Sequence, residues 1–275
     1  LTDSDHRVMA CFVDEADDEG FRQATREMTE LILQAQEATA WKKKEKQHRR
    51  GAFPALARGI SYGKGQPEPM RLGGDRQDVM EDLLAHPCFR RVAGFQSAAL
   101  STWFPCCYRE ALYRKRQLNQ LRPKLLPNFD NSVYSCMTVN FGPQTWTYIH
   151  TDSKNDPCLP CAVTSGGNYS WKLGGHMVLW DFGIILEFPP GTTILLSSAF
   201  LRHSNIPVLK GETRVSVTQY SAGSIRRWLE YGGRTEEAFK VQDPEAYTRE
   251  MEKRASRWKE ALDMYSTIEE LKAGQ

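Results

Sequence analysis

The middle of the chain is a series of short, β-prone segments, and this series limits the possible folds more than any other feature. Turn signals such as Gly174-Gly175, Pro189-Pro190-Gly191 and Lys210-Gly211 separate the segments. Many short strands at this spacing are typical of an antiparallel sandwich or barrel. The predicted strands cover residues 133–141, 146–150, 177–180, 184–188, 192–197 and 214–220.

Helical patterns flank this β region on both sides. Residues 78–84 and 95–121 are predicted to be helical, with a break at Pro105, whereas the glycines and prolines of 51–74 indicate an irregular connection. A first long helix is predicted near the N-terminus, where an apolar stripe recurs at steps of three and four and consists of Phe21, Ala24, Met28, Leu31, Ala35 and Ala38. Residues 42–50 are expected to extend or follow this helix.

The C-terminal part returns to helix. Asp243-Pro244 supplies a cap followed by a proline at the first helical position. A buried apolar stripe is expected to follow, formed by Met251, Ala255, Trp258, Leu262 and Tyr265. The chain is therefore predicted to be one integrated α+β domain with three parts: an N-terminal helical, partly basic region (1–130) packed on the core, a β core (131–232) and a C-terminal helical extension (233–275).

Length and composition are consistent with a soluble intracellular protein. A chain of 275 residues with 40% apolar content can bury a substantial core, and no stretch approaches the roughly 20 apolar residues of a membrane span. Its seven cysteines, an odd number, favour reduced thiols. Cys158 and Cys161 form a C-x-x-C pair, which leaves two readings open, namely a zinc site or ordinary packed thiols.

The residues that indicate chemistry lie in the β region. His150-Thr151-Asp152 follows a predicted strand, and the two-residue period of a strand places both potential ligands on the same side. An H-x-D tripeptide alone carries little weight, because it occurs by chance in many proteins. A third ligand, His203, follows a strand-like run about fifty residues downstream. Two histidines and one carboxylate on one face of an iron ion leave coordination positions open for an oxoacid and dioxygen.

A potential anion receptor follows the third ligand. Arg214 lies eleven residues after His203, and alternation places Arg214, Ser216 and Thr218 on one face of their strand. A guanidinium binds a carboxylate through two charge-assisted hydrogen bonds, and a neighbouring hydroxyl can add a third. These residues predict a receptor for the distal carboxylate of 2-oxoglutarate, with Asn140 as a further polar contact.

The order H-x-D, then His, then R-x-S resembles the 2-oxoglutarate/iron(II) dioxygenase superfamily over residues 132–222. Within it, the runs 174–179, 188–193 and 203–205 resemble the TET/JBP branch, including its fungal members. This resemblance implies a double-stranded β-helix (jelly-roll) that uses Fe(II), 2-oxoglutarate and O2 to oxidise a methyl group on a nucleic-acid base. It favours 5-methylcytosine, thymine or N6-methyladenine, and the expected substrates are 5-methylcytosine and N6-methyladenine in DNA. Asn140 before His150 also resembles the AlkB branch, which leaves the methylated atom open.

A DNA substrate agrees with the charge distribution. Residues 41–126 contain 18 Lys and Arg against 7 Asp and Glu, a net charge of +11. A base inside a duplex cannot reach a pocketed iron, so it would have to be flipped out, and basic residues would hold the phosphates. The predicted contacts are Lys42, Lys43, Lys44, Lys46, Arg49 and Arg50, together with His176, which is otherwise an ordinary polar residue near a turn.

Two other functions remain open at this stage. The same scaffold could hydroxylate a protein or a small molecule, or the chain could be a catalytically silent jelly-roll binding module. If DNA is the substrate, we expect a nuclear monomer that binds no membrane. Trp146, Trp171, Trp180 and Tyr220 are candidate aromatic residues for the base pocket, although core packing would also explain them.

Overall fold

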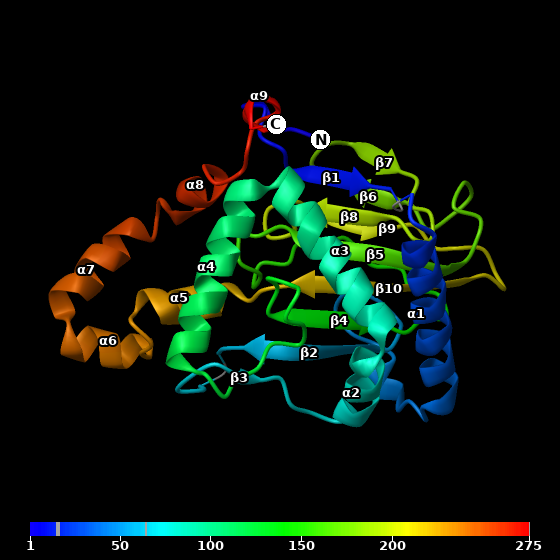
Figure 1. Ribbon diagram of the computed structural model, residues 1–275, viewed down its shortest axis with the longest axis horizontal. Coiled ribbons are helices and arrows are strands. Elements are labelled where there is room, and N and C mark those ends of the chain that lie inside the picture. Colours follow the sequence, from blue (N-terminus) through cyan, green and yellow to red (C-terminus); the bar gives the residue numbers. More distant parts are fainter. Residues whose placement is uncertain (15–16, 64, 275) are drawn as a thin grey trace.

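The computed structural model describes residues 1–14, 17–63 and 65–274, and its core consists of two antiparallel β-sheets (Figure 1). The larger sheet has seven strands in the order β1-β8-β5-β10-β4-β2-β3, and the smaller has the order β7-β6-β9. The strands are β1 (Ala10–Val13), β2 (Ala55–Ser61), β3 (Met70–Arg71), β4 (Cys136–Asn140), β5 (Cys161–Asn168), β6 (Met177–Leu179), β7 (Ile184–Leu186), β8 (Thr193–Leu196), β9 (His203–Asn205) and β10 (Thr213–Tyr220).

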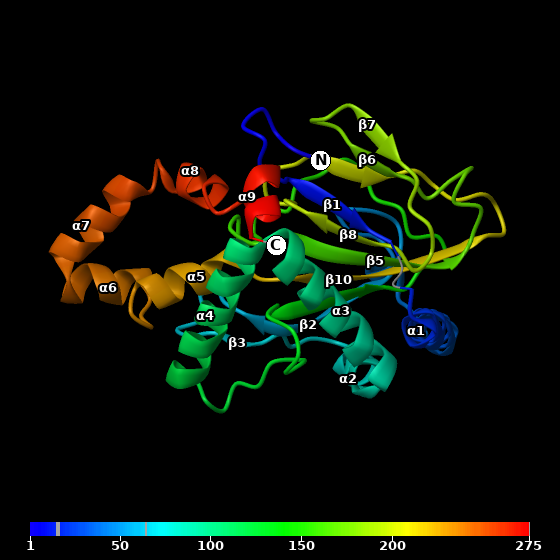
Figure 2. The same cartoon turned by 45° about the horizontal axis from the view of Figure 1, so that its top comes forward.

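A layer of helices covers the outer face of the larger sheet (Figures 1 and 2). The helices are α1 (Glu19–Ala38), α2 (Gln77–Ala85), α3 (Pro87–Trp103) and α4 (Pro105–Leu121). Met28 and Phe89 from this layer pack in one apolar cluster with Val215 and Val217 of β10, all of them fully buried. Burying each such side chain contributes roughly 1.5–3 kcal/mol. The odd-numbered residues of β10 thus anchor the helices, while its even-numbered residues face the other sheet.

The first helix and the break at Pro105 are confirmed. Phe21, Ala24 and Met28 are buried, Leu31 and Ala35 pack partly against the same cluster, and only Ala38 lies exposed. The helix approaches the sheet closely, since a Cβ added to Gly166 of β5 would lie 2.4 Å from Oγ1 of Thr29.

The N-terminal region differs from the prediction in two places. Residues 51–74 are not merely a connection, because they contain β2, which pairs with β4 in the larger sheet. Residues 42–50 do not continue the first helix and form only a short 3-10 helix, η1 (Lys43–Glu45), followed by a turn. The region before residue 131 therefore supplies β1, β2 and β3 as well as helices.

Two features of the β region were also predicted incompletely. Strand β5 was not predicted, because Gly166 and Gly167 within it weaken the β signal. Residues 146–150 form no regular strand and make a single antiparallel bridge, between His150 and His203. This bridge extends the smaller sheet by one segment.

Most of the C-terminal helices form an arm that projects from the body, and the last of them returns to the body beside the N-terminus (Figure 1). They are α5 (Gly223–Glu230), α6 (Glu236–Gln242), α7 (Pro244–Lys253), α8 (Arg257–Leu262) and α9 (Ile268–Ala273). Asp243 caps α7 through the N–H of Ala246, as predicted. The predicted buried stripe is wrong, because turns separate α7, α8 and α9, and they leave Trp258 52% exposed and only Tyr265 of the five fully buried.

None of the helices in the described part of the chain combines the length and apolar character needed to cross a bilayer.

The packing of α1 against the sheet can be tested by truncating its central side chain. Met28→Ala removes a fully buried side chain and should lower the free energy of unfolding by about 2–5 kcal/mol. The exposed neighbour Glu27→Ala should change it by less than about 0.5 kcal/mol. Urea unfolding followed by circular dichroism measures both, and equal effects would show that α1 is not packed as described.

Candidate metal and co-substrate site

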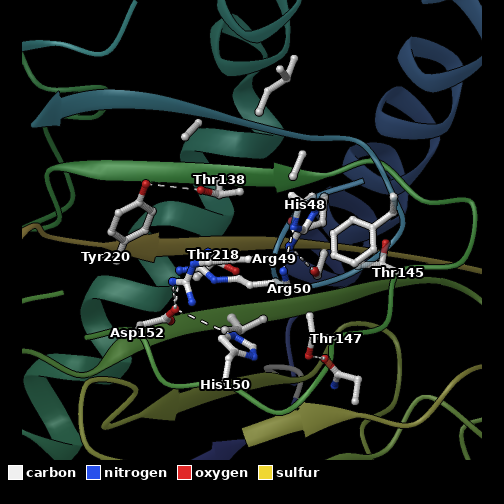
Figure 3. A pocket seen from close by; sticks show the side chains of 18 of the residues that line it. His48, Arg49, Arg50, Thr138, Thr145, Thr147, His150, Asp152, Thr218 and Tyr220 are labelled. Atoms are coloured by element: carbon white, nitrogen blue, oxygen red, sulfur yellow. Dashed lines mark hydrogen bonds and ion pairs between the residues drawn. The ribbon is translucent and has the colours of Figure 1, made fainter. Parts of the chain in front are cut away.

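A cavity of about 500 Å³ lies between the two sheets, and most of the residues that line it are polar or charged (Figure 3). Side chains from the larger sheet, the segment 145–155 and the N-terminal segment 41–53 line it. In Figure 3, Asp152 and Tyr220 lie at one end of the cavity, and Thr145 lies at the other. The cavity therefore has two distinguishable ends.

The predicted ligands His150, Asp152 and His203 meet in this cavity. One potential ligand atom from each lies within 4.8 Å of the others, and no other group of three such side chains is found in the described residues. The backbones of His150 and His203 exchange two hydrogen bonds, of 3.1 and 2.9 Å, which hold the imidazoles side by side. The N–H of Asp152 donates to the carbonyl of Ser198 at 2.8 Å, which fixes the carboxylate beside them.

Hydrogen bonds select the tautomer of both imidazoles. Nδ1 of His150 lies 2.8 Å from the carbonyl of Tyr148, and Nδ1 of His203 lies 2.9 Å from that of Leu201. A carbonyl only accepts, so each Nδ1 carries the proton and each Nε2 keeps a free lone pair. This orientation is typical of histidines that bind a metal ion.

Burial keeps both imidazoles neutral. Desolvation, followed by repulsion from His203, lowers the pKa of His150 to about 4. Desolvation also lowers the pKa of His203. At neutral pH both side chains are therefore uncharged, as a metal ligand must be.

Arg214 is buried without a carboxylate partner. Its side chain is 1% exposed, Nη1 donates to the carbonyl of Thr145 at 2.7 Å, and Nε has no partner in the described structure. Desolvation lowers its pKa. An unpaired buried charge costs several kcal/mol, so this end of the cavity is suited to a carboxylate. Arg214 is not itself among the residues that line the cavity, whereas Thr145, which it contacts, and Ser216 are.

Polar residues of β10 and β4 continue from Arg214 along the cavity. Asn140 donates to Oγ of Ser216 at 2.9 Å, as expected for two polar groups of one site. Thr218 and Tyr220 follow on the same face and also line the cavity. The six residue steps from Arg214 to Tyr220 span about 20 Å of strand. A dicarboxylate at the Arg214 end thus leaves the Tyr220 end free for a second molecule.

The predicted basic cluster divides into two groups. Lys44, Arg49 and Arg50 line the cavity, whereas Lys42, Lys43 and Lys46 are exposed outside it. Arg50 forms an ion pair with the Asp152 carboxylate, and Arg49 lies 4.0 Å from it. Arg50 is therefore in contact with a candidate metal ligand and is not free to hold a phosphate. Sequence reasoning found these arginines by charge but could not place them beside Asp152.

The turn that carries these arginines fits closely against the segment 146–148. The N–H of Tyr148 donates to the carbonyl of Arg50 at 2.8 Å. A Cβ added to Gly51 would lie 2.6 Å from the carbonyl of Trp146, so only glycine allows this approach. His48 in the same turn also lines the cavity and was not predicted.

Several other candidates lie away from the cavity. His176 is not among its lining residues, and neither are Trp146, Trp171 and Trp180, so Tyr220 alone of the predicted aromatics reaches it. Of the two cysteines, Cys161 lines the cavity and Cys158 does not. Both are buried free thiols, and burial raises the pKa of each to about 12. They belong to no metal-binding group in the described residues, which favours packed thiols over a zinc site.

No protein-family model matches the chain, and no curated protein matches it. The structure is similar to NgTET1, solved in complex with 5mC DNA, with a TM-score of 0.54 and 15% identity over 80% of this chain and 74% of that one. A 2OG-Fe(II) oxygenase family oxidoreductase from Burkholderia pseudomallei and a prolyl-4-hydroxylase from Pseudomonas putida align with TM-scores of 0.37 and 0.38, at 13% and 12% identity, over 77% of this chain and 84% and 91% of theirs.

At this level of identity the likeness to NgTET1 concerns the fold. The chain has the double-stranded β-helix fold predicted from its sequence, and the three ligands lie together inside it. The predicted fold class is therefore confirmed. The three side chains form a set that could hold a metal ion.

Removal of one ligand should abolish metal binding. His203→Ala takes away a lone pair aimed at the cluster, so affinity for Mn²⁺, used in place of Fe²⁺, should fall far more than about tenfold. His176→Ala removes a histidine outside the cavity and should leave affinity unchanged. Isothermal titration calorimetry measures both, and retention of binding by the His203 variant would refute the assigned site.

The role of Arg214 can be tested by a change that keeps its charge. Arg214→Lys loses the two-pronged geometry, so 2-oxoglutarate should bind at least about tenfold more weakly, and its stabilisation of the Mn²⁺-loaded protein should fall by about 1.4 kcal/mol. The exposed Arg202→Lys provides the control. Thermal unfolding with and without 2-oxoglutarate reports the difference, and equal shifts in wild type and the Arg214 variant would exclude this anchor.

Proposed function

We propose that the chain oxidises a methyl group on a nucleic-acid base, with 5-methylcytosine and N6-methyladenine in DNA as its substrates. The observation that carries the proposal is the pairing of an iron-type ligand cluster with a buried guanidinium that lacks a carboxylate. The TET-type fold and the basic side chains at the cavity favour a nucleic acid as the substrate.

Each part of the site has a separate task in this proposal. Nε2 of His150, Nε2 of His203 and the Asp152 carboxylate hold Fe(II), while Arg214, Ser216 and Asn140 hold 2-oxoglutarate by its distal carboxylate. With both bound, the site converts a methyl group, O2 and 2-oxoglutarate into a hydroxymethyl group, succinate and CO2. The surrounding sheets exclude bulk water and keep the substrate in position.

The nature of the methylated atom decides the final product. A hydroxymethyl group on nitrogen collapses to formaldehyde and the free amine, so N6-methyladenine would be demethylated. A hydroxymethyl group on carbon persists, so 5-methylcytosine would be converted to 5-hydroxymethylcytosine and remain open to further oxidation.

The cavity is suited to a base that has left its helix. It lies between two sheets, and a base within a duplex cannot reach its interior without being flipped out. Tyr220, Thr138 and Thr218 line the end away from Arg214 and can contact the face and edge of the base (Figure 3). Lys44 and Arg49 line the same cavity and can meet its phosphate. A nuclear location would follow from such a substrate.

Mass spectrometry of nucleosides tests this function directly. Incubation with Fe(II), 2-oxoglutarate, ascorbate and DNA bearing each methylated base should give the oxidised or demethylated nucleoside together with succinate. Asp152→Ala should reduce product formation by at least about 10³-fold, whereas His176→Ala should not.

The alternatives predict different results from the same assay. Succinate release with a protein extract but not with methylated DNA would identify a protein hydroxylase. No succinate release with any substrate, by protein shown to bind Mn²⁺ and 2-oxoglutarate, would indicate a silent binding module.

A further inference from the structure

A second and larger cavity, of about 940 Å³, opens beneath the C-terminal arm. We call it the arm cleft. Its walls come from α5, α7 and α8 on one side and from the end of β2 and the loop 153–158 on the other. In Figure 1 the arm stands away from the body on this side of the molecule.

The arm cleft adjoins the metal cavity. Asn155 lines both of them, three residues after the ligand Asp152. Its N–H donates to the carbonyl of Asp152 at 2.8 Å, and its side chain donates to Oγ of Ser198 at 3.2 Å. Asp152 lies at the same end of the metal cavity as Tyr220, away from Thr145 (Figure 3). A molecule in the arm cleft therefore borders the end that the co-substrate leaves free.

Three cations in the arm cleft have no acidic partner among the described residues. Lys154, Arg227 and Lys253 are exposed, line the cleft and take part in none of the ion pairs found there. Lys154 lies in the loop after Asp152, on one side of the cleft. Arg227 of α5 and Lys253 of α7 lie on the other side.

The remaining charges of the arm cleft mostly compensate one another. Arg226 donates to Asp156 at 2.9 Å, and Arg257 forms ion pairs with Glu250 and Glu230 that tie the arm to α5. Glu260 is the one lining acid outside these ion pairs in the described residues. The free charge of the cleft is therefore positive.

The arm cleft also presents an aromatic ring. Tyr62 lines it and packs against Trp228 with ring centroids 6.3 Å apart. Positive charge along a groove together with an aromatic surface is the combination that binds single-stranded nucleic acid, through the phosphates and by stacking of bases.

We propose that the arm cleft binds the strand that carries the target base, with Lys154, Arg227 and Lys253 on its phosphates and Tyr62 against a neighbouring base. This rests on the proposed function and extends it by placing the strand next to the flipped base. It also makes the C-terminal arm part of the substrate site.

Charge reversal tests the proposal. The triple variant Lys154→Glu, Arg227→Glu, Lys253→Glu should bind a fluorescent single-stranded oligonucleotide at least about tenfold more weakly. The slope of log affinity against log salt should fall by about 2, at about 0.7 for each lost phosphate contact. The control Lys240→Glu, Lys259→Glu, Lys272→Glu reverses three exposed charges of the C-terminal helices outside the cleft and should match wild type. Fluorescence anisotropy measures the affinities, and circular dichroism checks the fold.

Steady-state kinetics give an independent measurement. The triple variant should raise KM for a long methylated oligonucleotide at least tenfold and leave kcat and the KM for 2-oxoglutarate unchanged. A methylated dinucleotide is too short to reach all three cations, so its KM should change far less.

The outcomes separate this proposal from the function on which it rests. If the triple and control variants have the same affinity and the same salt slope, and wild type still oxidises methylated DNA, then only the proposed role of the arm cleft is refuted. Failure of wild type to oxidise any methylated nucleic acid would refute both.

Discussion

The structure of the site depends on one backbone pairing, the reciprocal hydrogen bonds between His150 and His203. The two histidines are 53 positions apart in the sequence, and this bridge brings their rings to a centroid separation of 4.3 Å. In each histidine, Nδ1 also contacts the backbone carbonyl of the residue two positions earlier. The same segments therefore set both the pairing of the two histidines and the tautomer of each imidazole. The metal cluster is therefore a consequence of how the smaller sheet is assembled.

The larger sheet separates an apolar face from a polar one. Val215 and Val217 of β10 bury against the helices, whereas the alternate residues Ser216 and Thr218 line the cavity, and Arg214 is buried on the same side of the strand. The apolar face supplies the burial that stabilises the sheet. That stability allows a guanidinium without a carboxylate to remain in the interior. Because leaving the Arg214 guanidinium unpaired costs free energy, this group is suited to binding a dicarboxylate.

The segments outside the β core take part in the site. The turn 48–51 places Arg50 against Asp152, and the arm encloses the cleft that adjoins the metal cavity. Part of the excess positive charge of residues 41–126 is balanced by acidic residues outside that segment, since Arg50 pairs with Asp152 and Arg91 pairs with Asp18. The charge of this segment did not point to the free cations of the arm cleft, because Lys154, Arg227 and Lys253 lie outside it.

Local periodicity and the order of residues along the chain were enough to predict most of the β core, the helices, the three candidate ligands and Arg214. Contacts between distant segments, by contrast, bring β2 into the sheet, place Arg50 against Asp152 and leave the predicted C-terminal stripe largely exposed. Strand β5 shows the physical reason. A Cβ on Gly166 or Gly167 would lie within 2.4 Å of Thr29 or the Thr213 carbonyl, so distant neighbours require the glycines that make its local pattern unlike a strand.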